Sequence, residues 1–321
     1  MRKKTLQKEK RSFEERVDAL AAKCPAFMRV IVVSTKCFIF YHGTIRAGAM
    51  TYTSFLALIP LLILLAAITL SLGMGTFFSD YLPILNSLFS LNLPLDEIMP
   101  MLKNAEQIPL RSLGLIGSAG LLITFILAIG NLEINMNVVW ENHTSRSITK
   151  QLLVYTPLLI LAASFFGLFA GVVSQFRHAL HTVVLAGNLF PIRYIGTLVD
   201  VFWMIAFHAG FILLFFVTLV LLPFRKDKVS YKKLLLPAFL ISIGMWVANS
   251  IYITALFYLQ SLLIARFSLF YGSLAFIPLA LLFVFGFWCI MLYGNGLVWT
   301  IYYYPRSFEK KWEWIQIRGN L

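Results

Sequence analysis

The chain has 321 residues, of which 60% are hydrophobic and only 13% are charged, and its mean hydropathy is +0.82. These values exclude an ordinary soluble domain, in which about 25% of the residues are charged. Several apolar runs are longer than the roughly 20 residues that a helix needs to cross a bilayer. The predicted fold class is therefore all-α: a polytopic membrane protein with six transmembrane helices and short interfacial helices.

Residues 1–43 are predicted to form a basic cytoplasmic segment that lies along the membrane. Ser12 and Glu15 fit a capping box, which predicts a short amphipathic helix ending at Pro25. The next apolar run, residues 27–41, contains Arg29 and Lys36 and is too short to span comfortably, so we expect an interfacial helix there. No cleavable signal peptide is expected, because residues 1–24 lack an apolar core.

Residues 44–304 are predicted to form the membrane domain, and residues 305–321 a cytoplasmic tail. Pro60 is expected to split the first span. In the last span Gly286, Gly294 and Gly296 offer bends or close helix contacts. The connection 74–111 is expected to hold short helices at the outer surface, either as a lid over helix ends or as a gate over a cavity. The six predicted spans are residues 45–73, 112–140, 152–176, 195–222, 234–260 and 270–303.

Basic residues predict how these spans are oriented. Of the 27 lysines and arginines, 21 lie in the N-terminal segment, the second and fourth connections and the tail, whereas the alternate connections carry five. This asymmetry predicts that both termini are cytoplasmic. The net charge of +13 is concentrated in residues 1–11 and 225–233, beside the cytoplasmic leaflet. We therefore expect anionic lipid headgroups as partners, with no nucleic acid; a homo-oligomer is compatible with this arrangement.

Glu133 is the most unusual residue of the predicted spans, because an ionised carboxylate at mid-bilayer costs on the order of 3 kcal/mol. Asn131, Asn135 and Asn137 make its surroundings a polar band, with 131 and 135 on one helix face and 133 and 137 on another. The band either holds the helices together by hydrogen bonds or lines a path for a substrate. In both cases we expect Glu133 to lie inside the bundle, within reach of Asn or Thr groups of neighbouring spans. The candidate substrate-path residues are Thr51, Tyr52, Glu133, Asn137, Asp200, His208 and Asn249.

No catalytic residue, metal site or cofactor is predicted, so we do not expect an enzyme. The closest histidine pair, His178 and His181, has no third ligand nearby, and such a pair is more typical of a surface than of a metal site. The sequence also contains no nucleotide-binding lysine loop, nucleophile elbow or CxxC motif.

Three motifs together resemble the YihY/BrkB family of bacterial inner-membrane proteins, formerly labelled ribonuclease BN. They are the string from Ala47 to Pro60, the ending Asn137-Val138-Val139-Trp140, and the string Tyr271 to Pro278 followed by Phe287-Trp288-Cys289-Ile290. The resemblance covers residues 30–305 and implies a six-span inner-membrane protein. One position departs from the family pattern: relatives often carry Gly-Ala-Glu where this chain has Gly294-Asn295-Gly296. An acidic role at that position therefore does not carry over.

Two functions fit the sequence. The first is a transporter or flippase-like protein for a lipid-derived or amphipathic substrate. The alternative is a non-transporting membrane scaffold for envelope assembly. Convergence of the candidate residues on one open cavity would favour transport, whereas scattered or sealed side chains would favour the scaffold. Ribonuclease activity is not expected, because RNA hydrolysis needs a ligand or acid–base cluster that RNA can reach, and the predicted cytoplasmic segments offer none.

Overall fold

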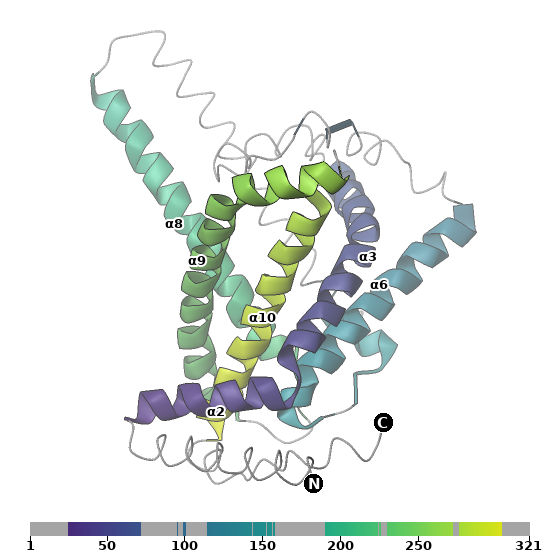
Figure 1. Ribbon diagram of the computed structural model, residues 1–321, viewed down its shortest axis with the longest axis vertical. Helices are drawn as coiled ribbons and strands as arrows, with labels where there is room; N and C mark the ends of the chain where they lie inside the picture. The colour runs from purple at the N-terminus through teal and green to yellow at the C-terminus, as the bar shows by residue number, and fades with distance from the viewer. Residues whose placement is uncertain are drawn as a thin grey trace.

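The computed structural model describes residues 25–71, 114–142, 144–151, 153–155, 190–223, 230–271 and 276–303, with isolated positions 95, 99, 100, 157 and 225 (Figure 1). Residues 58–71, 114–122, 190–200, 260–271 and 276–277 are described by their backbone alone. The regular secondary structure of the described residues is helical throughout. The predictions for the helix at 12–24, the tail, most of the connection 74–111 and most of the third span fall outside these residues.

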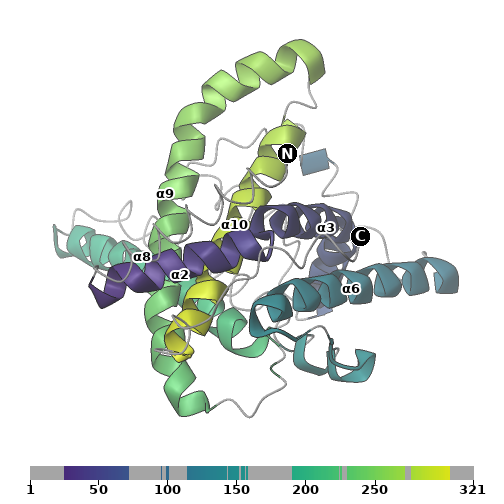
Figure 2. The ribbon, with the colours of Figure 1, turned by 60° about the horizontal axis from the view of Figure 1, so that its bottom comes forward.

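Two helices joined by a tight corner begin the described chain. The first, α2 (Ala26–Phe40), lies across the ends of the others, and α3 (Gly43–Ser71) rises from it (Figures 1 and 2). The corner is tight, since the amide of His42 donates to the carbonyl of Ile39 at 3.1 Å and His42 adopts a left-handed φ of 53°. The predicted short helix at residues 27–41 is confirmed, and its crosswise position suits a helix lying on a membrane surface.

The predicted split at Pro60 is wrong, because α3 continues without interruption through residue 60 to Ser71. Proline removes one backbone hydrogen bond, but a helix packed among neighbours tolerates that loss. The second predicted span appears as α6 (Gly114–Asn137), which ends in a 3-10 turn, η2 (Val138–Trp140). The fourth appears as α8 (Phe190–Leu221).

The boundary between the last two predicted spans is also wrong. α9 (Tyr231–Tyr271) has 41 residues and does not end near residue 260, as predicted, but continues to Tyr271. α10 (Phe276–Tyr302) begins at residue 276 and not at the predicted residue 270. The reason is local, because residues 257–271 contain no proline or glycine that would end a helix. The last turns of α9 bend across toward the start of α10 (Figure 1). With 27 residues, α10 is about 40 Å long at 1.5 Å per residue.

The core forms around α10, which packs against α9, α3 and α2, while α6 packs on α3 and α8 on α9. Two glycines allow α10 to approach α9 closely: a Cβ at Gly286 would overlap the ring of Tyr252, and one at Gly294 would overlap the side chain of Met245. These glycines therefore serve close helix contact. Among the described residues, two stretches are long and apolar enough to cross a membrane, Tyr231–Leu256 and Ala280–Tyr302.

Candidate functional site

Glu133 lies near the end of α6 and is completely buried, with no exposed side-chain surface. Its Oε2 accepts a hydrogen bond from the hydroxyl of Tyr155 at 2.8 Å, and its Oε1 accepts one from the backbone amide of Arg146, also at 2.8 Å. The guanidinium of Arg146 lies 3.5 Å from Oε1 and completes an ion pair. The predicted burial of Glu133 is thus confirmed. Its partners are an arginine and a tyrosine, however, and not the Asn or Thr side chains that we expected.

The same arginine also holds the end of α8. Arg146 donates from Nη1 to the carbonyl of Leu222 at 3.1 Å and from Nη2 to that of Leu221 at 3.0 Å. The last carbonyls of a helix have no partner within the helix and carry partial negative charge, so a guanidinium is a favourable cap there. The hydroxyl of Tyr155 lies 3.2 Å from the Leu222 carbonyl as well. One ionic cluster, Glu133–Arg146–Tyr155, therefore connects the ends of α6 and α8 to the segment that follows α6.

A second arginine caps the preceding carbonyls of α8. Arg225 donates to the carbonyls of Leu219 and Val220, both at 2.8 Å, and its guanidinium lies over the ring of Trp140 at 4.2 Å from the centroid. Burial lowers the pKa of Arg225 to about 10, so it remains charged at neutral pH. The stacked cation on the indole ring attaches η2 to the end of α8.

The other face of the polar band contacts α3. Asn131 donates to the hydroxyl of Thr53, and Asn135 accepts from Nη1 of Arg46 at 3.1 Å while donating to the side chain of Asn131 at 2.9 Å. We call these four residues (Arg46, Thr53, Asn131 and Asn135) the polar seam. The predicted division of the band between two helix faces is confirmed, because residues 131 and 135 face α3 whereas Glu133 and Asn137 face the segment after α6.

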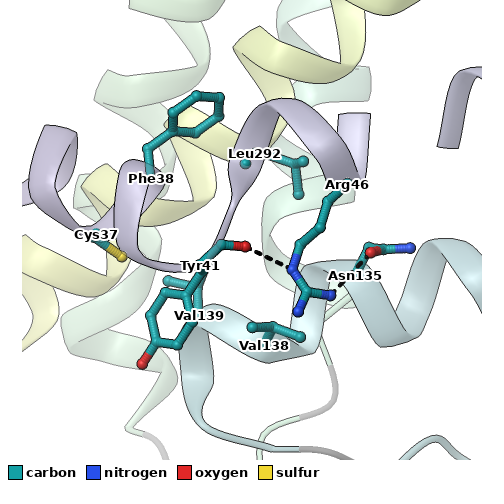
Figure 3. Close-up of a pocket in the computed structure, with 9 residues that line it drawn as sticks. Cys37, Phe38, Tyr41, Arg46, Asn135, Val138, Val139 and Leu292 are labelled. Atoms are coloured by element: carbon teal, nitrogen blue, oxygen red, sulfur yellow. Dashed lines mark hydrogen bonds between the residues drawn. The ribbon is translucent and has the colours of Figure 1, made fainter. Parts of the chain in front are cut away.

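At the end of the polar seam nearest α2 there is a small pocket that is open to the surface (Figure 3). Arg46 anchors it, donating from Nε to the backbone carbonyl of Tyr41 at 2.7 Å. The ring of Tyr41 points its hydroxyl away from this guanidinium, toward Glu141, whose Oε1 accepts it at 3.3 Å. Burial raises the pKa of Tyr41 above its ordinary value. The pocket is lined by Cys37, Phe38, Tyr41, Gly43, Arg46, Asn135, Val138, Val139 and Leu292.

Most of the other substrate-path candidates do not join these sites. The hydroxyl of Thr51 bonds to the carbonyl of Ala47 in its own helix, and Tyr52 points outward with 66% of its surface exposed. His208 accepts the indole hydrogen of Trp246 at 3.3 Å, between α8 and α9. Asn249 is buried on α9. Asp200 lies on α8, and its side chain is outside the described set.

Asn137 is the exception, because it supports the segment that carries Arg146. It is fully buried, and its Nδ2 donates to the carbonyl of Thr144 at 2.9 Å. Asn142 reinforces the same turn by accepting from both the amide and the hydroxyl of Thr144. Of the predicted candidates, the structure thus brings together Glu133 and Asn137 alone within the described residues.

The position that departs from the family pattern has a structural explanation. Asn295 is completely buried, accepts from the indole nitrogen of Trp140 at 2.9 Å and donates to the carbonyl of Met136 at 2.8 Å. An amide supplies both an acceptor and a donor, whereas an ionised carboxylate only accepts. Asn295 therefore joins α10 to the end of α6 and to Trp140 of the second sequence motif.

Two helices that are long and apolar enough to cross a membrane fit an integral membrane protein of helical type, and comparison with known proteins supports that class. A family model described as "Virulence factor BrkB" matches residues 38–313, and the chain belongs to this family. A UPF0761 membrane protein of Yersinia pestis (strain Pestoides F) is 28% identical over 187 residues, and one of Yersinia pseudotuberculosis serotype O:3 (strain YPIII) matches equally well. Each match covers 58% of this chain and 58% of the relative. No solved structure matches this chain.

The sequence points to Glu133 but not to its partners Arg146 and Tyr155, nor to the second arginine cap, Arg225. The charge pattern places Arg146 and Arg225 in cytoplasmic connections, and the hydropathy pattern places Tyr155 in the third predicted span. One signal could have pointed to them: a buried carboxylate requires a compensating cation, and Arg146 is the first basic residue after α6.

Proposed function

We propose that this chain is a six-span inner-membrane protein, with both termini in the cytoplasm, that moves a lipid-derived or amphipathic substrate across the bilayer. It acts without a catalytic site or a cofactor of its own. The ionic cluster Glu133–Arg146–Tyr155 is the observation that carries this proposal. In the proposed orientation it lies at the cytoplasmic ends of the spans.

The cost of that cluster is the argument for movement. Two charges removed from water are rarely more stabilising than well-packed apolar side chains of the same volume, so a static scaffold gains little from them. A switch gains more, because a buried ion pair favours one arrangement of the helices and opposes others. The cluster holds α6, α8 and the segment after α6 together at one end. We infer that it closes the cytoplasmic end of the bundle and opens during transport.

A specific observation supports the alternative, a non-transporting scaffold for envelope assembly. Most candidate residues are sealed in local contacts or face outward, as Thr51, Tyr52 and His208 do. They do not meet in one cavity within the described residues. The scaffold therefore stays as the second candidate, and the experiment must separate the two.

A lipid-scrambling assay on the purified protein makes that separation. The protein is reconstituted into vesicles that contain a fluorescent phospholipid, and an impermeant quencher reports how much label crosses from the inner leaflet. We expect transport with the wild-type protein and a loss of at least tenfold with Glu133→Gln. Ser250→Ala, which removes a hydroxyl bonded to its own helix, is the matched control and should be unaffected. The assay is run with phospholipids and with lipids that accumulate in a deletion strain. If lipid transfer in vesicles with the wild-type protein is no faster than in protein-free vesicles, transport is refuted and the scaffold is the function that remains.

The proposed topology is tested separately by labelling single cysteines introduced near residues 5, 90, 146, 185, 228 and 315. Positions 5, 146, 228 and 315 should react only from the cytoplasmic side, and 90 and 185 only from the outside. Labelling of position 90 from the cytoplasmic side alone would refute the proposed topology.

A further inference from the structure

The pocket at the corner of α2 and α3 combines a cation with unused hydrogen-bonding capacity. Arg46 uses Nε and Nη1 for Tyr41 and Asn135, and within the described part of the chain no hydrogen bond forms at its Nη2. A guanidinium held by two neutral acceptors keeps its full charge and a fixed orientation. The hydroxyl of Tyr41, which donates to Glu141, points away from the guanidinium (Figure 3). The pocket is therefore positive and prearranged to accept an anionic oxygen.

Exposed apolar side chains adjoin the polar seam above this pocket. On α3 they are Ile45, Tyr52 and Leu56, which are 71%, 66% and 51% exposed. On α6 they are Ile123, Leu127 and Ile134, which are 57%, 66% and 43% exposed. We call these six residues the apolar rims.

The two rims lie on the same side of the helix pair. A helix turns by about 100° per residue, so on each helix the apolar rim lies about 90° around the helix axis from the polar seam. The rotation has the same sense on both helices. The helices run in opposite directions, since α3 rises from the end that carries α2 and α6 descends to it (Figure 1). Opposite direction and equal rotation place both rims on one face, with the polar seam between them. The face is thus polar along its middle, apolar at its borders and cationic at one end.

We propose that this face binds a phosphate-bearing lipid, with the phosphate in the Arg46 pocket and the acyl chains along the apolar rims. Arginine donors suit phosphate oxygens better than a point charge does, because a planar guanidinium fixes the geometry as well as the charge. The seam amides and hydroxyl offer further polar contacts to a headgroup that leaves the pocket along α3 and α6. This assignment rests on the proposed function in one respect: it names the substrate class of that transport.

Lipid binding is measured apart from transport, by native mass spectrometry of the whole protein in a maltoside detergent. Phosphatidate is compared with diacylglycerol of the same chains, and with inorganic phosphate. We expect phosphatidate to be retained and diacylglycerol to be lost. Arg46→Gln should weaken phosphatidate binding about tenfold, the size expected for one charged hydrogen bond. Lys36→Gln removes a charge from α2 outside the pocket and should change binding less than twofold.

The same experiment defines what would overturn the site. Equal effects of Arg46→Gln and Lys36→Gln would refute a specific pocket, and binding of inorganic phosphate as tight as that of phosphatidate would refute a lipid ligand. If Arg46→Gln fails to fold, the wild-type protein is labelled with a phosphatidate that carries a photoreactive acyl chain. Crosslinks should then fall on Ile45, Tyr52 and Ile134, and equal labelling of Ile251 on α9, which is 65% exposed, would reject the site. If the protein binds phosphatidate but does not scramble lipid, only the transport proposal is refuted. If it scrambles lipid and Arg46→Gln leaves the rate unchanged, only the proposed binding site is refuted.

Discussion

Glu133 and Arg146 should stabilise the protein as a pair, and a double-mutant cycle tests this directly. Arg146→Gln leaves a completely buried carboxylate without its cation and removes the donors to two carbonyls of α8. Breaking a buried ion pair costs about 3–5 kcal/mol, and we expect the lower end, about 3 kcal/mol, because Arg146 is still 15% exposed. Water can therefore reach part of the vacated space.

Glu133→Gln should cost less, about 1–2 kcal/mol. The isosteric amide keeps one acceptor for the amide of Arg146, and Tyr155 can donate to the carbonyl of Leu222 instead. What is lost is the charge, which makes such hydrogen bonds roughly twice as strong as neutral ones. In the double variant the carboxylate is already absent, so removing Arg146 no longer leaves a buried charge alone. We expect a coupling energy of at least about 1 kcal/mol between the two changes.

The cycle is measured by reversible unfolding of the four purified proteins in mixed detergent, followed by far-ultraviolet circular dichroism. Tyr155→Phe is a useful reference, because it removes one hydrogen-bonding hydroxyl without changing charge and should cost about 1 kcal/mol. Additive single effects, within about 0.5 kcal/mol, would refute the reasoning, since they would mean that the ion pair contributes nothing beyond its separate contacts.

Three further outcomes follow from the described contacts, and a fourth follows from the sequence. Gly286→Ala should destabilise by about 1 kcal/mol, because the new methyl group displaces the ring of Tyr252, whereas Gly48→Ala meets open space and should be neutral or stabilising; equal melting temperatures for the two variants would contradict this. Asn295→Asp keeps the size of the side chain but should cost at least about 2 kcal/mol by burying a charge that cannot donate to Met136; the loss should show in detergent-unfolding midpoints, and a midpoint equal to that of the wild type would contradict this. Because burial raises the pKa of Tyr41, the stability that its neutral form contributes is complete below pH 10 and is lost as the pH rises above it; Tyr41→Phe should flatten this alkaline decline, and an unchanged pH profile would argue against the burial. Protein freed of contaminating nucleases should not cleave RNA with any divalent metal, and activity that disappears on mutation of Glu141 would overturn this expectation.

Hydropathy and charge patterns determined the class of this protein without any tertiary information. Apolar runs longer than a bilayer crossing predicted α3, α6, α8, α9 and α10 to within a few residues at most ends. The prediction works because a chain in lipid must satisfy its backbone groups within each helix, so composition along one segment suffices. It failed where a local signal was ambiguous. Pro60 did not end α3, and the absence of a helix breaker after residue 256 let α9 continue to Tyr271.

The partners of the buried polar groups were decided by tertiary structure alone. Helical periodicity placed Asn131 and Asn135 on one face and Glu133 on another, and both assignments were correct. Periodicity cannot say which distant segment meets each face. Arg146 reaches Glu133 because Asn137 and Asn142 fold the segment after α6 back on itself, and Arg46 reaches Asn135 because α3 packs against α6. The local sequence determines on which face of a helix a residue lies, whereas the contacts between elements depend on how the whole chain packs.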